Sequence, residues 1–296
     1  MSEFYPDRRA VERFRFALID ATYREDLPSS WPCTVVAPSF LDDDTDRCPV
    51  LVDLPSLPDV ERAEWCDALH EETLAMNDTR ASLLLASDGT AQGVAAHMAR
   101  RMTLRLPNQT HPMQWRYFDP GTLLQMPRVL GQAGMAWLMG PVSSIMVPWA
   151  GEWTRLDQPA SPSPAQASTF KLSDSHLAAL LRVGIVNRVG MACPPPGGSA
   201  AWTDQCETLD KHVVNAQEKH GLTQRDDLIA FALHAHTVHP DIHRHPQMQS
   251  ILAAIREPVS GGCVHYADLT GALQPQDWQS MLADLSHPPT REALQP

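Results

Sequence analysis

Complete catalytic motifs are scarce in this chain. It has no G-x-S-x-G elbow, no G-x-x-x-x-G-K phosphate loop and no G-x-G-x-x-G turn. These patterns are typical of serine hydrolases, P-loop nucleotide-binding proteins and dinucleotide-binding proteins. His70-Glu71-Glu72 begins like the zinc-protease motif H-E-x-x-H, but Leu74 stands where the second histidine is needed. No local pattern therefore indicates one of these enzyme classes, and we expect a protein that is not an enzyme.

Cysteines and long apolar runs are also few. The six cysteines among 296 residues are scattered, with no C-x-x-C pair, which favours reduced, mostly buried thiols over a disulfide framework. The most apolar stretch, 138–150, is too short for a membrane span and contains Pro141 and Pro148. The first residues lack the basic-then-apolar layout of a signal peptide. We expect a cytoplasmic protein with no membrane partner.

Basic residues are outnumbered along the whole chain. There are 23 Lys and Arg against 35 Asp and Glu, a net charge of −12, and both residues 1–157 and the remainder are acidic. A protein that binds nucleic acid usually carries a basic patch, so we expect no nucleic-acid partner. The arginines at 100, 101 and 105 are most simply a solvated helix face, and contact with an acidic partner is the alternative.

Short apolar runs alternate with helical patterns in the first half of the chain. This alternation predicts an α/β (α+β) lobe with a mixed sheet over residues 1–157. The predicted strands lie at 33–37, 50–54, 82–86, 113–118, 142–147 and 152–156, and the predicted helices lie at 8–23, 60–76, 91–102 and 122–136.

The second half has a different composition. Residues 158–169 are rich in Pro and Ser, which predicts a linker without packed structure. Beyond it, apolar residues at helical spacing predict an all-α lobe over 170–296, with Phe231 facing inward. The expected helices lie roughly at 173–190, 201–220, 223–238, 246–256 and 275–285.

Histidines gather in the second half, at positions 234, 236, 239, 243 and 245. His239 and His243 are four residues apart, but Pro240 should end a helix between them. No Cys or carboxylate completes a tetrahedral set at the usual spacing. We expect structural or surface histidines and no metal or other cofactor. The alternative is a metal-dependent hydrolase that uses the cluster from His234 to His245.

The block Trp115-Arg116-Tyr117-Phe118-Asp119-Pro120 is the most informative segment. Its aromatic residues favour a strand, and the Asp-Pro-Gly sequence at 119–121 favours a turn that stops it. After a helical pattern comes Leu138-Met139-Gly140-Pro141-Val142, and then a second strand with Trp149 and Trp153.

With this ordered set, the chain resembles the type VI secretion effector-adaptor (chaperone) family, known as domain of unknown function 4123. The family pattern is a strand of the form aromatic-Arg-aromatic-Tyr/Phe-Asp-Pro, a helix, then Phe/Leu-x-Gly-Pro-Val, a strand and a Trp-containing stretch. Upstream, an apolar strand precedes a helix with Arg near its end, here 82–87 followed by Arg100 and Arg101.

The resemblance covers residues 15–157 and extends loosely into the helical part, where His245-Pro246 fits. It implies a non-enzymatic adaptor in the bacterial cytoplasm. Such an adaptor binds a cognate toxin and promotes its loading on the valine–glycine-repeat (VgrG) spike protein. The candidate partner-binding residues are Arg100, Arg101, Phe231 and His245, and the residues of the two motif blocks are the candidate structural ones.

Overall fold

A computed structural model describes residues 3–4, 13–41, 44–74, 79–107, 109–159, 170–194, 196–256 and 264–287. The chain forms two compact units, one of residues 1–180 with 197–201 and the other of 181–196 with 202–296. The division falls within helix α7 (Asp174–Ala192). Most of the predicted linker, residues 160–169, lies outside the described residues, so the linker stays a prediction.

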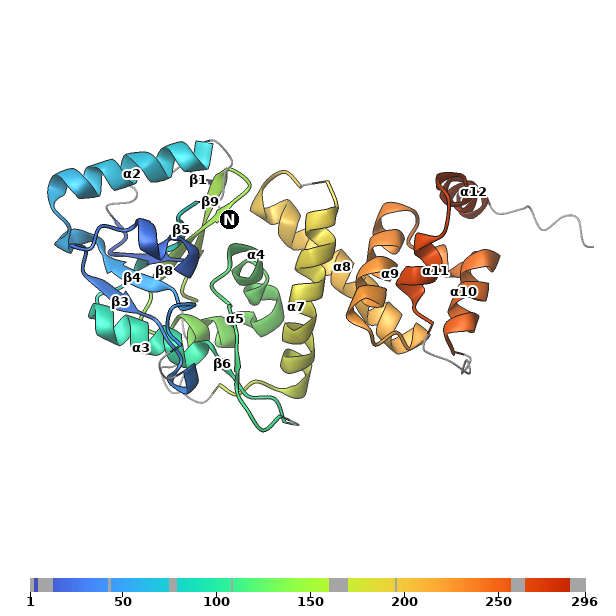
Figure 1. The fold of residues 1–296 in the computed structure, drawn as a ribbon, viewed down its shortest axis with the longest axis horizontal. Helices are drawn as coiled ribbons and strands as arrows, with labels where there is room; N and C mark the ends of the chain where they lie inside the picture. Colours follow the sequence, from blue (N-terminus) through green and yellow to red (C-terminus); the bar gives the residue numbers. More distant parts are fainter. Residues whose placement is uncertain are drawn as a thin grey trace, which may run out of the picture. The chain divides into compact units, whose positions relative to one another are not determined.

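The first unit is built on a seven-stranded sheet in the order β1-β9-β8-β5-β2-β4-β3 (Figure 1). Helices accompany this sheet, and a series of helices follows it, so the predicted fold class is confirmed. The strands are β1 (Glu3–Phe4), β2 (Phe16–Ile19), β3 (Cys33–Val35), β4 (Val50–Asp53), β5 (Ala81–Ala86), β8 (Ser144–Trp149) and β9 (Glu152–Asp157).

The expectation of a mixed sheet was wrong, because every pair of neighbouring strands described here is antiparallel. Helices between strands usually connect parallel neighbours, and α2 (Asp59–Leu74) does connect two strands of the same direction, β4 and β5. However, β2 lies between these two strands and is antiparallel to both.

The helix predicted at 8–23 was also wrong in the part that the structure describes. Residues 8–12 lie outside the described residues, β2 occupies Phe16–Ile19, and a short 3₁₀-helix, η1, spans Ala21–Asp26. All four residues of β2 are fully buried, so both faces of the sheet are covered at this central strand. A continuous apolar run is what a strand buried on both faces requires, and it hides the alternation that identifies half-buried strands.

Helices α2 and α3 (Ala91–Arg101) lie on opposite sides of the sheet (Figure 1). Trp65 and Leu69 of α2 pack with Ala17 and Ile19 of β2 in one buried cluster. Trp153 of β9 belongs to the same cluster, and its indole Nε1 donates a 2.8 Å hydrogen bond to Thr73 of α2.

The strand predicted at 113–118 is much shorter in the structure. Only β7 (Met113–Gln114) is a strand, and it pairs with β6 (Thr103–Leu104) in a separate two-stranded sheet. Tyr117 and Phe118 are buried at 3% and 0% exposure outside any strand, so their burial, not a pleated surface, explains the aromatic run. Helices α4 (Pro120–Leu123) and α5 (Met126–Met139) follow.

The second unit is helical. Its helices are α8 (Gly198–His220), which begins in the first unit, α9 (Arg225–Thr237), η4 (Ile242–Arg244), α10 (Pro246–Arg256), α11 (Tyr266–Gly271) and α12 (Pro275–Ser286). Trp202 of α8 is 1% exposed and packs against Gly190 of α7, where any side chain would meet the indole ring. Phe231 and Tyr266, also fully buried, extend this core.

Two expectations from composition can be compared with the described residues. None of the five described cysteines forms a disulfide bond; four of them are buried, whereas Cys33 is exposed. None of the described helices has the length and apolarity needed to cross a membrane.

Candidate functional site

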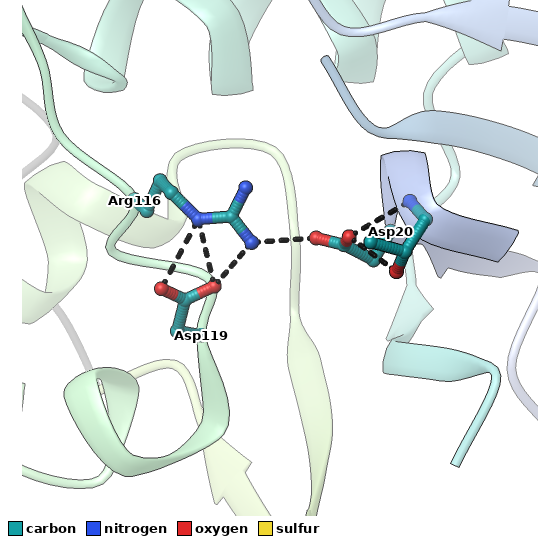
Figure 2. A network of polar contacts seen from close by, with 4 residues as sticks. Asp20, Arg116 and Asp119 are labelled. Atoms are coloured by element: carbon teal, nitrogen blue, oxygen red, sulfur yellow. Dashed lines mark hydrogen bonds and ion pairs between the residues drawn. The ribbon is translucent and has the colours of Figure 1, made fainter. Parts of the chain in front are cut away.

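Arg116 of the aromatic motif lies between two carboxylates (Figure 2). Its guanidinium donates to both oxygens of Asp119, at 2.9 to 3.2 Å, and Nη2 also donates to Asp20 at 2.6 Å. Asp20 in turn begins η1, where its Oδ1 accepts from the backbone N–H and the hydroxyl of Thr22. The motif is thereby fastened to the end of β2, almost a hundred residues earlier in the chain.

The environment affects the two carboxylates differently. Burial raises the pKa of Asp20, but hydrogen bonds from Thr22 and Arg116 outweigh it, so the net pKa is lowered. Burial raises the pKa of Asp119 above its ordinary value, and Arg116 offsets this only in part. Asp119 is the N-cap residue of α4, yet its side chain makes no cap hydrogen bond, because it is turned to Arg116.

The rest of the motif is scaffold. Tyr117 and Phe118 lie in the core, and the half-buried Trp115 ring is 5.5 Å from the ring of Tyr117. Burial raises the pKa of Tyr117 well above its ordinary value. Pro120 is the first residue of α4, a position where its fixed φ suits a helix. These side chains hold the segment in place and leave little of it for a partner.

The second motif block, Gly140-Pro141-Val142, is also structural. Gly140 ends α5 with φ of +56°, and a Cβ there would overlap the ring of His97. His97 is buried, and its Nε2–H donates to the carbonyl of Leu138 at 2.9 Å. The carbonyl of Pro141 accepts from Ser87 at 2.8 Å, and Val142 is 2% exposed. The block thus connects the end of α5 to α3 and to the residue after β5.

An open groove of about 700 Å³ lies in the first unit beside α3. Its apolar lining includes Leu104, Trp137 and Phe170, and its charged lining residues are Arg100, Arg105 and Lys171. None of the residues that line it is acidic. The groove therefore combines aromatic surface with positive charge.

The aromatic wall of the groove is held by Arg101. The guanidinium carbon of Arg101 is 4.1 Å from the centroid of the Trp137 ring, and its Nε donates to the Trp137 carbonyl at 2.9 Å. The ring of Phe170 packs against the same indole at a tilt of 44°, with ring centroids 5.4 Å apart. Arg101 acts as a positioning residue, whereas Arg100 faces the groove itself.

Phe231 and His245, the two candidate partner-binding residues of the helical unit, do not line the groove. Phe231 is fully buried against His220 and Tyr266, as its inward position predicted, so its proposed role as a contact for a partner was wrong. His245 is 12% exposed in its side chain, and its Nε2 lies 3.3 Å from Asp284 of α12. This histidine ends η4, directly before α10, and connects it to α12.

The histidines at 234–245 have separate surroundings. His234 contacts Tyr266 and Trp278, His236 contacts His212, and His243 contacts His220. Within the described residues, no three His, Cys, Asp or Glu side chains are placed to hold a metal ion. A smaller hollow of about 500 Å³ lies beside His234 and Trp278, with Arg188 and Asp226 at its lining.

The sequence predicts only part of the groove. Arg100 was recognised from a run of arginines, but Trp137 and Phe170 come from segments with no local pattern in common. Phe170 and Lys171 directly follow the predicted linker, where composition offers no signal for a surface. Comparison of the chain with protein-family models, curated proteins and solved structures found no match.

Proposed function

We propose that this protein is a non-enzymatic adaptor that binds a cognate type VI secretion toxin in the bacterial cytoplasm and promotes its loading on the VgrG spike. The resemblance of the two motif blocks to the adaptor family supports this proposal. Their described side chains act together as scaffold, through Arg116 between Asp20 and Asp119 and through Gly140 against His97. A scaffold role for the shared residues leaves binding to surfaces outside the motif.

The observation that carries the proposal is the groove beside α3. Its lining joins two aromatic rings to three cationic side chains. Aromatic residues and Arg are enriched where proteins bind one another, because they contribute a large contact area together with hydrogen bonds. A surface of this kind suits a segment of another protein.

Co-expression tests the proposal with the full chain. The toxin encoded beside this gene is produced alone, with this chain, and with this chain and the neighbouring spike protein. We expect the toxin to be poorly soluble or unstable alone, to become soluble with the adaptor, and to copurify with it. The reason is mass action, since a partner that binds only the folded toxin shifts its equilibrium by RT ln(1 + [L]/Kd).

An unrelated acidic protein of similar size serves as the control for nonspecific solubilisation. The adaptor proposal is refuted if the full chain binds neither a locally encoded toxin nor a spike protein. Secretion adds an independent readout, because deletion of the gene should abolish delivery of that toxin while delivery of toxins from other loci continues.

A further inference from the structure

The groove beside α3 has a charge opposite to that of the whole protein. The chain carries a net charge of −12, yet the charged residues that line the groove are Arg100, Arg105 and Lys171. No carboxylate of the described residues forms an ion pair with any of these three. Concentrated positive charge on an acidic protein attracts and orients negatively charged partners.

The groove also has an apolar wall that is fixed in place. Arg101 stacks on Trp137 and bonds to its carbonyl, and Phe170 packs against the same indole. A rigid aromatic wall loses little conformational entropy when another apolar side chain packs on it. The volume of about 700 Å³ lies in the range that accommodates compact ligands, so it suits a short segment and not a folded domain.

We infer that this groove binds an acidic segment of the toxin in which carboxylates flank one or two bulky apolar side chains. The apolar side chains pack on Trp137 and Phe170, and the carboxylates pair with Arg100, Arg105 and Lys171. The inference rests on the proposed adaptor function for its choice of the toxin as partner. If the toxin exposes such an apolar segment when it is produced without the adaptor, the segment promotes aggregation of the toxin. Binding in the groove would cover the segment.

The charge-reversal variant Arg100→Glu/Arg105→Glu tests the groove. Both side chains are exposed, so the variant should fold. The matched control is Lys211→Glu/Arg244→Glu, which makes the same charge change at exposed positions of the helical unit. We expect the dissociation constant for the purified toxin to rise at least about tenfold in the groove variant and to stay within about twofold in the control. Circular dichroism and thermal melting verify folding.

A random peptide library displayed on phage provides a test that does not depend on the toxin. Selected on the full chain and counter-selected on the groove variant, it should yield acidic peptides that contain an aromatic residue or leucine. Enrichment of basic or uncharged peptides would overturn the groove chemistry. Unchanged toxin affinity in the groove variant would overturn the toxin as occupant. Absence of any toxin binding by the wild-type chain, with acidic peptides still selected, would reject the adaptor function and keep the groove chemistry.

Discussion

Single residues of the two motif blocks stabilise the fold because their positions accept only one type of side chain. Gly140 combines a positive φ with the close approach of the His97 ring. Arg116 holds two carboxylates from distant parts of the chain. The sequence resemblance identifies these residues, but the physical reason for each depends on a partner far away in the sequence.

Replacing Gly140 with alanine should destabilise the protein by about 2 kcal/mol or more. A positive φ alone costs a residue other than glycine about 1 kcal/mol or more, and the added Cβ would displace the His97 ring. Urea denaturation measures the change. Gly184→Ala is the matched control, because Gly184 lies in helix α7 with nothing near its Cβ position. That substitution should be neutral or stabilising by up to about 1 kcal/mol.

Replacing Asp119 with alanine should reduce the free energy of unfolding by about 1 kcal/mol, through loss of its charged hydrogen bonds to Arg116. Replacing Arg116 with alanine should have a larger effect, because both Asp20 and Asp119 lose a partner. The double variant measures the coupling, expected at about 0.5 kcal/mol or more for groups in contact. Unchanged thermal stability with lost toxin binding would assign Asp119 to the interface and not to the scaffold.

At the scale of helices and strands, the sequence predicts an element well when one of its faces is buried and the other is exposed to solvent. The predicted helix at 246–256 coincides with α10, because its apolar residues lie on one side of a helix whose other side faces solvent. Strand β2 was mistaken for a helix because both of its faces are buried. Helix α11 was missed because its six residues span too few turns for a period to be visible.

The packing of α7 on α8 offers a test at this scale. Arg182 of α7 bonds to Asp210 of α8 at 2.7 and 3.2 Å, with only 17% and 13% of the two side chains exposed. Arg182→Ala should destabilise the protein by about 2 kcal/mol, because it leaves a largely buried carboxylate without its guanidinium. The double variant Arg182→Met/Asp210→Leu should be less harmful than Arg182→Ala. Chemical denaturation measures both changes, and a double variant at least as unstable as Arg182→Ala would contradict this prediction.

At the scale of the whole molecule, buried and half-buried histidines make stability depend on pH. Burial lowers the pKa of His234 to about 4, and burial together with the nearby His243 lowers the pKa of His220 to about 4. Burial also lowers the pKa of His97, His212 and His243. The unfolded chain titrates near 6.5 and therefore binds protons first as the pH falls.

We therefore expect stability to be fully present above about pH 6.5 and to decline as the pH falls towards about 4. For His234 alone the loss of stability at pH 5 is about 2 kcal/mol, because about 1.36 kcal/mol is lost for each pH unit between the unfolded pKa near 6.5 and the folded pKa of about 4. Thermal melts from pH 7.5 to 4.5 measure it. His234→Phe should make the decline less steep, because the other histidines still contribute, whereas His111→Gln, at an exposed position, should reproduce the wild-type curve. A pH-independent melting temperature would contradict the prediction.

The groove beside α3 could be identified only from the three-dimensional structure. The sequence indicated Arg100 through a local run of arginines, but the groove needs Trp137 from α5 and Phe170 from beyond the predicted linker. Contacts between segments so far apart depend on how the elements pack, and local periodicity carries no information about that packing. At Phe231, by contrast, the sequence predicts a residue that contacts a partner, whereas the side chain is buried in the core of the helical unit.

The strand order of the first unit has a consequence for its synthesis on the ribosome. Strand β2 pairs with β4 and β5, but the other side of β5 pairs with β8 through Leu84 and Met146. Until residues 144–149 have emerged, the nascent chain therefore carries a buried-type strand, Ala81–Ala86, with one open edge. An open apolar edge invites pairing with other chains. Fragments that end before β8 should therefore aggregate during translation, and truncations for expression should include β8 and β9.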